Sequence, residues 1–522
     1  MNAPLTTPAL IPDHPRVAVI GAGPGGLAAA MQLAAAGARV TLYEKDGVVG
    51  GRTRTLEAPG GYRFDLGPTF FLYPRILAEI FAVCGARLEE EVELIRLDPQ
   101  YRLLFEGGES IEATADLGRM EAEIAKLCPA DARGLRPWMA ENAAKLAAFR
   151  PVLERAFHSP ADVLGLDMLR ALRLLRPGRS VDADLARHFR DPRVRLAFSF
   201  QSKYLGMSPF RCPSLFTILS YLEYAHGVFH PRGGCGAVSA AMARVAARLG
   251  VEIRLDAPVE RIAFSGNRAV GVEVAGCRHA AAAVVLNGDF AHAVPRLIPP
   301  ELRRRWSDRR IGAARYSCST FMLYLGVEGT FPGLAHHNVL LAEDYRRNIR
   351  QIDAGELPDV PSLYLQHAGA TDATMAPPGH SSLYLLVPVP NLRNGTDWQA
   401  EAPRYRDLAL SRLRALGIED IESRIRYERM VTPRDWQAEF AVGYGATFNL
   451  AHDLGQMLCF RPGNRFGDVA GVYLVGGGTH PGSGLPVIYE GARITSRLVA
   501  QDLGLAPAPL AERATALREK MA

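Results

Sequence analysis

A strand, a glycine-rich turn and a helix follow one another near the start of the chain and limit its fold class. Residues 16–20 read RVAVI, residues 21–26 read GAGPGG, which fits G-x-G-x-x-G, and helix-forming residues continue up to Gly37. A second apolar run, RVTLY at 39–43, ends beside Glu44. This order of elements is typical of the first half of a dinucleotide-binding unit. The sequence therefore predicts a Rossmann-like α/β domain.

Each residue type in this motif has a physical task. Gly21 permits the tight turn, Gly23 lets the backbone approach a pyrophosphate, and Gly26 allows the helix to pack closely on the strand. The helix N-terminus supplies amide donors and the positive end of a dipole, and Glu44 would accept hydrogen bonds from ribose hydroxyls. The nucleotide contacts predicted from this motif are Gly21, Ala22, Gly23, Gly25, Gly26 and Glu44.

Residues 17–38 are also apolar enough to suggest a membrane span. The glycines and Pro24 at their centre instead favour a buried strand, turn and helix.

A second glycine pair follows directly after Glu44. The sequence continues KDGVVGGRTRT, with Gly50, Gly51 and Arg52, and then GYRFDLGPTFF at 61–71. A nicotinamide enzyme has no evident need for this second loop, whereas the long FAD molecule needs further backbone donors and a cation as it continues across the sheet. The loop therefore favours FAD; the alternative is that VVGGRT forms an ordinary surface turn.

These motifs resemble the FAD-binding start of the bacterial-type phytoene desaturase (carotenoid desaturase) family, which is related to the flavin amine oxidases. Its blocks here are GAGPGGLAAA, EKDGVVGGRTRT and YRFDLGPT, and later blocks at 200–219, 230–262, 284–298, 383–392 and 471–488 follow in family order. The resemblance implies a discontinuous FAD-binding domain at 1–100, 225–300 and 455–505, a substrate-binding sheet domain at 301–454, and a helical, membrane-facing region at 101–224.

The resemblance also implies further, non-covalent contacts with FAD. Val259, in the second of two strands expected at 251–264, would hold the adenine through its backbone. The last glycine loop, GGGTHPGSG at 476–484, would close the same site before a helix that begins at Ile488, whose positive end would face the flavin. The further predicted contacts are Lys45, Gly51, Arg52, Thr53, Gly67, Pro68, Thr69, Val259, Gly478, Thr479, Leu485, Pro486 and Val487.

The activity implied by the resemblance is FAD-dependent desaturation of an apolar linear isoprenoid, such as phytoene or dehydrosqualene, in carotenoid biosynthesis. Removing a hydride and a proton from a CH2–CH2 unit asks little of the protein beyond alignment and exclusion of water, because the flavin accepts the hydride. Candidate proton acceptors are Asp65, Glu223, His480 and Glu490. The sequence assigns none of them a catalytic role.

No second complete nucleotide motif occurs in the chain. RGGCGAVSAA at 232–241 carries Ser239 where the third glycine would stand, and no apolar strand precedes it. A built-in NAD(P)H site is therefore not expected, and electrons would leave the flavin for oxygen, a quinone or another acceptor.

A basic amphipathic segment lies at 163–195. Leu164, Met168, Leu172 and Leu175 share one helical face, and eight arginines stand against three aspartates between residues 170 and 195, beginning with Arg170, Arg173 and Arg176. Such a segment can lie on an anionic membrane surface; the alternative is an ordinary amphipathic helix packed on its own domain. We expect a cytoplasmic, peripherally membrane-associated protein.

Charge and cysteine content exclude other classes. The chain has 60 basic and 55 acidic residues, a balance that does not predict nucleic-acid binding. Its seven scattered cysteines indicate reduced thiols rather than a disulfide framework, and they lack metal-ligand spacing. Residues 1–15 are expected to form a short disordered lead.

Three other functions stay open at this stage. A polyene oxygenase or isomerase would share the same loops. A flavin amine oxidase is disfavoured, because such enzymes rely on a lysine from the middle or later part of the chain, and no lysine lies between residues 203 and 520. They also often attach flavin to a late cysteine, and none follows Cys459. The third alternative is a non-enzymatic polyene carrier.

Overall fold

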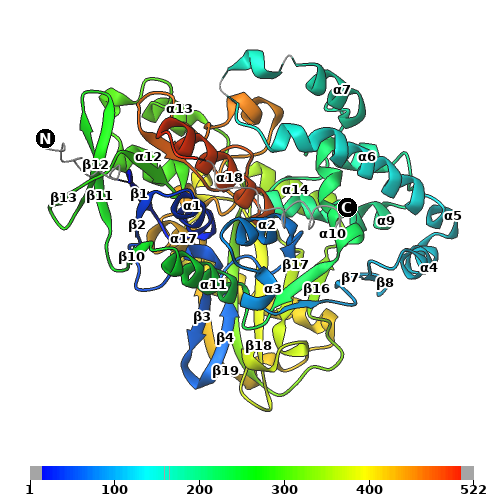
Figure 1. The fold of residues 1–522 in the computed structure, drawn as a ribbon. Coiled ribbons are helices and arrows are strands. Elements are labelled where there is room, and N and C mark those ends of the chain that lie inside the picture. Colours follow the sequence, from blue (N-terminus) through cyan, green and yellow to red (C-terminus); the bar gives the residue numbers. More distant parts are fainter. Residues whose placement is uncertain (1–13, 158, 164, 507–522) are drawn as a thin grey trace, which may run out of the picture.

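A five-stranded parallel sheet forms the base of the dinucleotide-binding half (Figure 1). The computed structural model describes residues 14–157, 159–163 and 165–506. In spatial order the strands are β10 (Glu252–Arg254), β2 (Arg39–Tyr43), β1 (Arg16–Ile20), β14 (Ala283–Leu286) and β20 (Val472–Leu474). Segments far apart in the sequence thus meet in one sheet. The predicted α/β class and its first strand–helix–strand unit are confirmed; the expected lead at 1–15 lies almost wholly outside the described residues.

Small residues let three helices pack closely around the first helix. Helix α1 (Pro24–Ala35) reads PGGLAAAMQLAA, and its glycine, alanine and leucine residues are almost all buried. It packs against α18 (Leu485–Asp502), α11 (Cys235–Arg248) and α2 (Arg75–Val83), and these helices share one core with the strands. A helix that is apolar all round is buried on every side, so the segment at 17–38 is an interior strand, turn and helix.

A second, seven-stranded sheet carries the other half of the molecule. Its spatial order is β19 (Ile425–Val431), β15 (Ser319–Glu328), β18 (His380–Val389), β17 (Leu363–His367), β16 (His337–Leu341), β7 (Tyr101–Phe105) and β8 (Ser110–Ala113). All pairs are antiparallel except β16 with β7. The first part of the predicted helical region is therefore wrong: residues 101–113 are two strands, and helices begin at Leu117.

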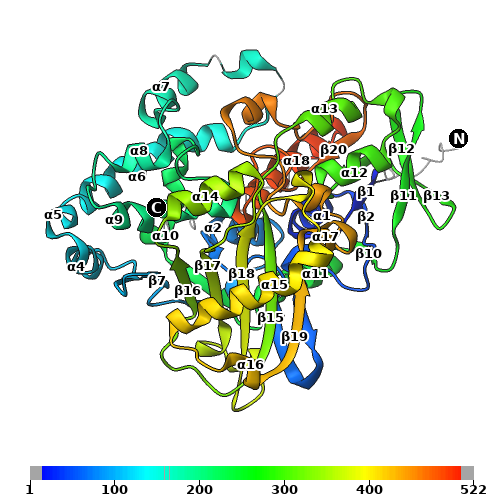
Figure 2. The same cartoon turned by 180° about the vertical axis from the view of Figure 1, so that it is seen from behind.

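The two faces of this sheet have different neighbours. Phe321 and Leu323 on β15 pack against α15 (Trp398–Ser411), which lies across the sheet in Figure 2. Thr320 and Met322 alternate with them along the strand and line a cavity on the opposite face. Side chains of a strand point alternately to its two faces, so one run of residues serves both a core and a binding cavity.

Helices between residues 117 and 226 form one side of the molecule (Figures 1 and 2). They are α4 (Leu117–Leu127), α5 (Pro129–Ala132), α6 (Leu135–Leu153), α7 (Leu166–Leu175), α8 (Val181–Leu185), α9 (Pro192–Ala197) and α10 (Thr217–His226). Among the helices of the described ranges, none is both long and apolar enough to cross a membrane. The division of the chain at the other predicted domain boundaries stays a prediction.

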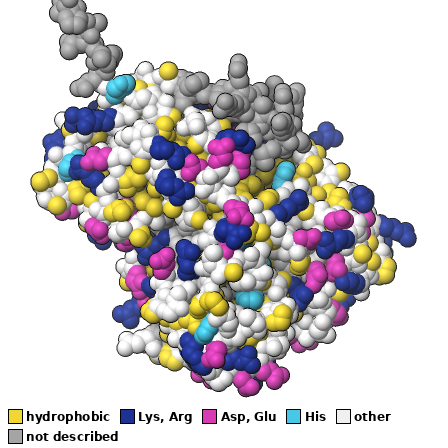
Figure 3. All heavy atoms as spheres, turned by 60° about the horizontal axis from the view of Figure 1, so that its bottom comes forward, with side chains coloured by type: hydrophobic (Ala, Val, Ile, Leu, Met, Phe, Trp, Pro, Cys, Tyr) yellow, Lys and Arg dark blue, Asp and Glu magenta, His cyan; other side chains and the backbone are white. Residues whose placement is uncertain are grey.

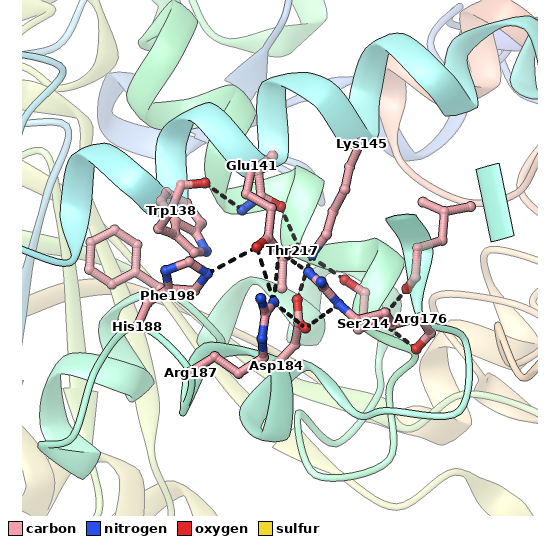
Figure 4. A network of polar contacts seen from close by, with 12 residues as sticks. Trp138, Glu141, Lys145, Arg176, Asp184, Arg187, His188, Phe198, Ser214 and Thr217 are labelled. Atoms are coloured by element: carbon pink, nitrogen blue, oxygen red, sulfur yellow. Dashed lines mark hydrogen bonds and ion pairs between the residues drawn. The ribbon is translucent and has the colours of Figure 1, made fainter. Parts of the chain in front are cut away.

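Ion pairs occupy much of the arginine-rich segment. Lys145 on α6 is fully buried, and its Nζ lies 2.5 Å from the Asp184 carboxylate and 3.2 Å from Glu141 (Figure 4). Arg176 and Arg187 pair with the same two carboxylates. Burial opposes ionisation of Glu141, but these cations outweigh it and lower its pKa to about 2. These arginines therefore stabilise the helical region itself.

The predicted apolar face of this segment is only partly exposed. Met168 and Leu175 are buried, whereas Leu172 is 39% exposed. Leu164 and the side chain of Arg170 lie outside the described residues. Figure 3 views another part of the surface, with the bottom of Figure 1 turned forward, and there Lys and Arg side chains are interspersed with Asp and Glu, without a broad area of one sign.

The remaining elements connect these parts. They are α3 (Leu88–Glu91), α12 (Phe290–Leu297), α13 (Asp308–Ala313), α14 (Tyr345–Ala354), α16 (Ile421–Arg424), α17 (Pro433–Ala438), β3 (Thr55–Ala58), β4 (Tyr62–Asp65), β5 (Phe71–Leu72), β6 (Leu94–Arg96), β9 (Val228–Pro231), β11 (Val259–Ser265), β12 (Arg268–Val274) and β13 (Cys277–Ala280). Strands β10 and β11 match the two strands predicted at 251–264.

Candidate functional site

One cavity of about 720 Å³ joins the two sheets. At one end it is lined by the loops that follow β1, β2, β14 and β20, and at the other by the seven-stranded sheet and residues 200–222. Strand β1 lies at the centre of this sheet. The strand that follows it in the chain, β2, lies on one side of it, and the later strand β14 lies on the other. Ligands of open parallel sheets bind at the carboxyl ends of strands where the order reverses in this way.

The structure brings most of the predicted contacts to this cavity. The predicted residues in its wall are Gly21, Gly23, Glu44, Lys45, Gly51, Arg52, Thr53, Gly67, Pro68, Thr69, Val259, Leu485, Pro486 and Val487. They come from segments separated by more than 400 residues, and the fold places them around one space.

Three residues of the first glycine motif lie behind the cavity wall. They are Ala22, Gly25 and Gly26, all fully or almost fully buried. A Cβ on Gly26 would lie 2.0 Å from the Gly21 carbonyl oxygen, so only glycine fits where the helix meets the turn. The Ala22 amide donates to Glu44 Oε2 at 2.7 Å.

The last glycine loop contacts the cavity at different residues than predicted. Gly476 and Gly477 line it, whereas Gly478 and Thr479 do not. A Cβ on Gly478 would meet Asn449 and Phe290 at 2.6 Å, so this glycine packs against protein. Helix α18 also begins at Leu485 rather than Ile488, because Pro486 is favoured in a first helical turn. Leu485, Pro486 and Val487 are therefore that first turn.

The loop after β14 is the largest part of the site that the sequence analysis missed. Asn287, Gly288 and Asp289 line the cavity, and the side-chain Nδ2 of Asn287 donates to the Gly21 carbonyl at 3.0 Å. The signal was available in AVVLNGD, where a fully apolar strand ends in polar and small residues. Its role depends on β14 lying beside β1, which this single sequence does not reveal.

Arg52 and Asp289 interact electrostatically at the end of the cavity that the glycine loops line. Burial lowers the pKa of Arg52 and raises that of Asp289, and each opposes the other's shift. Arg52 donates to the Thr447 carbonyl at 2.5 Å, while Asp289 accepts from the Gly443 amide and the Asn449 side chain. The cavity thus holds a fixed cation beside glycine loops.

None of the four candidate proton acceptors lines the cavity. Asp65 accepts from the Cys235 amide, and Glu223 lies within a buried cluster with Tyr101 and Gln201. His480 is buried, and burial lowers its pKa to about 4. Glu490 is buried beside Arg493. Their sequence positions near glycine loops did not reveal that they point into the protein interior.

Two tyrosines, Tyr364 and Tyr384, instead line the cavity. Tyr364 OH lies 2.7 Å from both Thr69 Oγ1 and His337 Nδ1. Tyr384 OH donates to the Gly67 carbonyl at 2.7 Å. Both tyrosines therefore contact the loop at 67–69, close to where the two parts of the cavity meet.

The substrate-facing wall is mainly apolar. It includes Phe70, Leu72, Phe200, Leu205, Leu219, Leu222, Met322, Val339, Leu341, Leu363, Leu386 and Pro388. Lys203 also lies in this wall. The absence of lysines between residues 203 and 520 therefore does not exclude a lysine from the cavity wall, because Lys203 itself lies there.

Comparison with known proteins identifies close relatives. The family model for flavin-containing amine oxidoreductases matches residues 24–504. The chain is 42% identical to a 4,4'-diapophytoene desaturase (4,4'-diapolycopene-forming) of Methylomonas over 93% of this chain and 95% of that protein. It is 40% identical to an all-trans-zeta-carotene desaturase of Myxococcus xanthus over 94% of both chains.

Solved structures agree on the fold. Cyclohexylamine oxidase from Brevibacterium oxydans superposes with a TM-score of 0.56 at 18% identity, covering 94% of this chain and all of that one. Putrescine oxidase bound to putrescine gives a TM-score of 0.61, also at 18% identity, and covers 94% and 99%. These similarities concern the fold alone.

Proposed function

The chain belongs to the flavin-containing amine oxidoreductases and, among them, to the phytoene and diapophytoene desaturases, and from that premise we propose that it desaturates a linear isoprenoid polyene with FAD in carotenoid biosynthesis. The observation that carries this proposal is the single cavity that joins glycine loops to a largely apolar wall. Phytoene or dehydrosqualene would lie along the seven-stranded sheet, with its reacting bond at the loop 67–69.

The glycine loops suit a bound dinucleotide. A Cβ on Gly51 would lie 3.4 Å from the Gly23 Cα, an ordinary contact distance, so the two loops lie side by side, and the φ of +51° at Gly51 favours glycine there. Arg52 supplies a cation, Glu44 a buried carboxylate for ribose hydroxyls, and Val259 a backbone edge for adenine. FAD fits this set of donors and acceptors.

The attachment of FAD is proposed to be non-covalent. In the described part of the wall the cysteine is Cys318, whose pKa is raised by burial, so it is a thiol rather than a reactive thiolate. Flavin released entirely by acid precipitation would support this; flavin left on the precipitated protein would contradict it.

Bound FAD would supply the hydride acceptor, and the chain's own residues would align the polyene and receive its proton. Tyr364 is the best-placed acceptor, because it lines the cavity and its hydroxyl contacts His337 Nδ1. The substrate proton would pass to the Tyr364 oxygen while the hydroxyl proton passes to His337. Burial lowers the pKa of His337 well below its usual value, so its ring is neutral before the reaction and would hold the proton only transiently. Oxygen or a quinone would then reoxidise the flavin.

Purified FAD-loaded protein, incubated with liposomes that carry phytoene, dehydrosqualene, squalene or a finished polyene, tests this function. New conjugated double bonds, followed by absorbance and chromatography, support desaturation. An added carbonyl would instead identify an oxygenase, and a geometric isomer an isomerase. Flavin reduction by putrescine without reaction of any polyene would identify an amine oxidase, and polyene binding without turnover a carrier.

A further inference from the structure

A lysine without a partner lies in the wall of the apolar cavity. Four lysines fall within the described residues, and three of them pair with carboxylates: Lys45, Lys126 and Lys145. Lys203, in the turn Phe200–Leu205, makes no side-chain hydrogen bond or ion pair there. Burial lowers its pKa. Removing an ammonium group from water without a counter-charge is costly, so this position calls for a polar group on whatever fills the cavity.

The nearest acidic group is already engaged elsewhere. Asp353 interacts with Lys203 only at electrostatic range, and its carboxylate lies 3.7 Å from the Arg211 guanidinium. The other groups that act on Lys203 are Cys212 and Cys318, whose pKa values are raised by burial. Neither thiol can neutralise the cation.

A second unpartnered donor stands in the same wall. Tyr345, the first residue of α14, is 5% exposed, and its hydroxyl has no hydrogen-bond partner within the described residues. Like Lys203 it lines the cavity and lies within electrostatic range of Cys318. A buried hydroxyl left without a partner is destabilising. Both donors thus lie in the part of the wall near Cys318, where an oxygen atom of a ligand could accept from them.

We propose that Lys203 and Tyr345 together bind an oxygen atom, carbonyl or carboxylate, at one end of the polyene in this cavity. This inference rests on the proposed function and extends its substrate class to polyene chains with an oxidised terminus, which would bind more tightly than the hydrocarbons. The ammonium group and the hydroxyl both donate, and hydrogen bonds from a charged donor are about twice as strong as neutral ones. A pure hydrocarbon would leave both donors unpaired, which is how a polar site rejects a ligand that lacks the matching group.

Binding of three polyenes of equal length to the FAD-loaded protein tests the proposal. The probes are a hydrocarbon, its terminal aldehyde and its terminal carboxylate, each presented in neutral phosphatidylcholine vesicles and followed by its own absorbance shift. We expect the wild-type protein to bind the oxygenated chains about tenfold more tightly than the hydrocarbon, as one charge-assisted hydrogen bond allows. The carboxylate and aldehyde arms distinguish pairing with a charge from hydrogen bonding alone.

Variants separate this role from a structural one. Lys203→Met keeps the length of the side chain and removes the charge, and it should bring the affinity ratio close to one while hydrocarbon binding stays equal or improves. Tyr345→Phe should lower the ratio by a smaller factor. Lys126→Met, at an exposed lysine on α4, is the matched control and should leave the ratio unchanged. Lys203→Leu repeats the test if the methionine variant does not fold.

Four outcomes would overturn the proposal. Equal wild-type affinity for hydrocarbon and oxygenated chains, or an unchanged ratio in Lys203→Met, removes this inference and leaves desaturation standing. Loss of flavin in Lys203→Met, with flavin retained in Lys126→Met, would assign the cation to the cofactor. Failure of the wild-type protein to bind any of the polyenes would remove the proposed function, and this inference with it.

Discussion

Two tyrosine hydroxyls in the cavity wall differ in the groups that they touch, and this difference can be tested. Tyr364 contacts an imidazole nitrogen, whereas Tyr384 donates to a backbone carbonyl and, within the described residues, hydrogen-bonds to no acid or base. Tyr364→Phe should slow flavin reduction by the polyene about 100-fold, as loss of a proton acceptor does. Tyr384→Phe should slow it much less. Anaerobic stopped-flow absorbance of the flavin measures both, and equal losses in the two variants would contradict the assignment.

The pH dependence of this step follows from the direction of the His337 shift. Because burial lowers its pKa well below the usual value, His337 stays neutral down to acidic pH and loses its acceptor nitrogen only when pH falls further. The rate of flavin reduction should therefore stay level between about pH 6.5 and 8. A rate that rises with pH across this window would mean that another group receives the proton.

The buried carboxyl of Glu223 should make stability pH-dependent. Burial raises its pKa to about 7, against the opposing hydrogen bonds from Gln201, Tyr204 and Tyr101. The folded state thus holds this proton more tightly than the unfolded state, so stability is full below pH about 4.5 and is lost as pH rises towards 7.

Glu223→Gln removes that titration while it keeps the shape and the hydrogen-bonding oxygen. From pH about 5 to 7.5 the wild-type free energy of unfolding should fall relative to the variant by about 2 kcal/mol. Urea unfolding at several pH values measures the difference, and parallel pH profiles would show that Glu223 ionises normally.

At the residue scale the sequence predicted contacts wherever backbone geometry dictates the residue type. Gly21, Gly23 and Glu44 followed from one local motif, and all three lie at the cavity. Asn287 and Lys203 could not be predicted in the same way, because their roles arise only when distant strands and turns meet. The four candidate acids and bases failed for a related reason: a sequence shows that a group ionises but not which way its side chain points.

At the scale of elements, the Lys145 network joins α6 to α8 and to Thr217 of α10 (Figure 4). Lys145→Met would leave the Asp184 carboxylate buried and without its closest cation. Breaking a buried pair in this way costs about 3–5 kcal/mol, so the melting temperature should fall by several degrees.

Lys126→Met, which removes an exposed lysine paired with Glu123, is the control and should cost at most about 1 kcal/mol. Differential scanning calorimetry compares the two variants. Similar small losses in both would indicate that the remaining arginines compensate for the missing lysine.

Helix α7 gives the proposed membrane contact a definite surface. Leu172 and Leu174 are exposed on α7, and Leu454 and Phe460 are exposed in a segment whose neighbour Cys459 shares a core with Met168 and Leu175. We propose that these four side chains enter the acyl boundary of the membrane. Leu172→Ser with Leu174→Ser should reduce co-flotation with anionic liposomes about tenfold, since each buried leucine contributes roughly 1.5–3 kcal/mol at most.

The matched control is Leu255→Ser, at an equally exposed leucine beside β10, on the opposite side of the molecule from α7 in Figure 1. Its flotation should equal that of the wild-type protein. Equal flotation of all three proteins would contradict a role for α7.

The helical periodicity of 163–179 predicted a helix with one apolar face, and α7 spans Leu166–Leu175. Periodicity could not indicate that Arg176 and Arg187 pair with Glu141, which precedes them by 35 or more residues. The composition of 101–113 did not indicate strands either. These two short strands at the sheet edge form because β7 pairs with β16 and β8 pairs with β7, rather than through local propensity.

At the scale of the whole molecule, the proposed FAD site brings together loops from distant parts of the chain. Residues 438–442, 447–449, 476–477 and 483–488 line the same cavity as the first glycine motif. A ligand that binds only the folded state adds about 4 kcal/mol at a thousandfold excess over its dissociation constant. Removing the flavin should therefore lower the melting temperature and speed amide exchange in these loops.

Helix α15 provides the internal reference for that experiment, because it packs on the face of the seven-stranded sheet that is turned away from the cavity. Its amide exchange, measured by mass spectrometry on flavin-free and reconstituted protein, should not change. Uniform acceleration across α15 and the loops would mean that the flavin stabilises the whole fold rather than its site. No change in the loops would place the cofactor elsewhere and contradict the assignment of Arg52 and Gly51 to it.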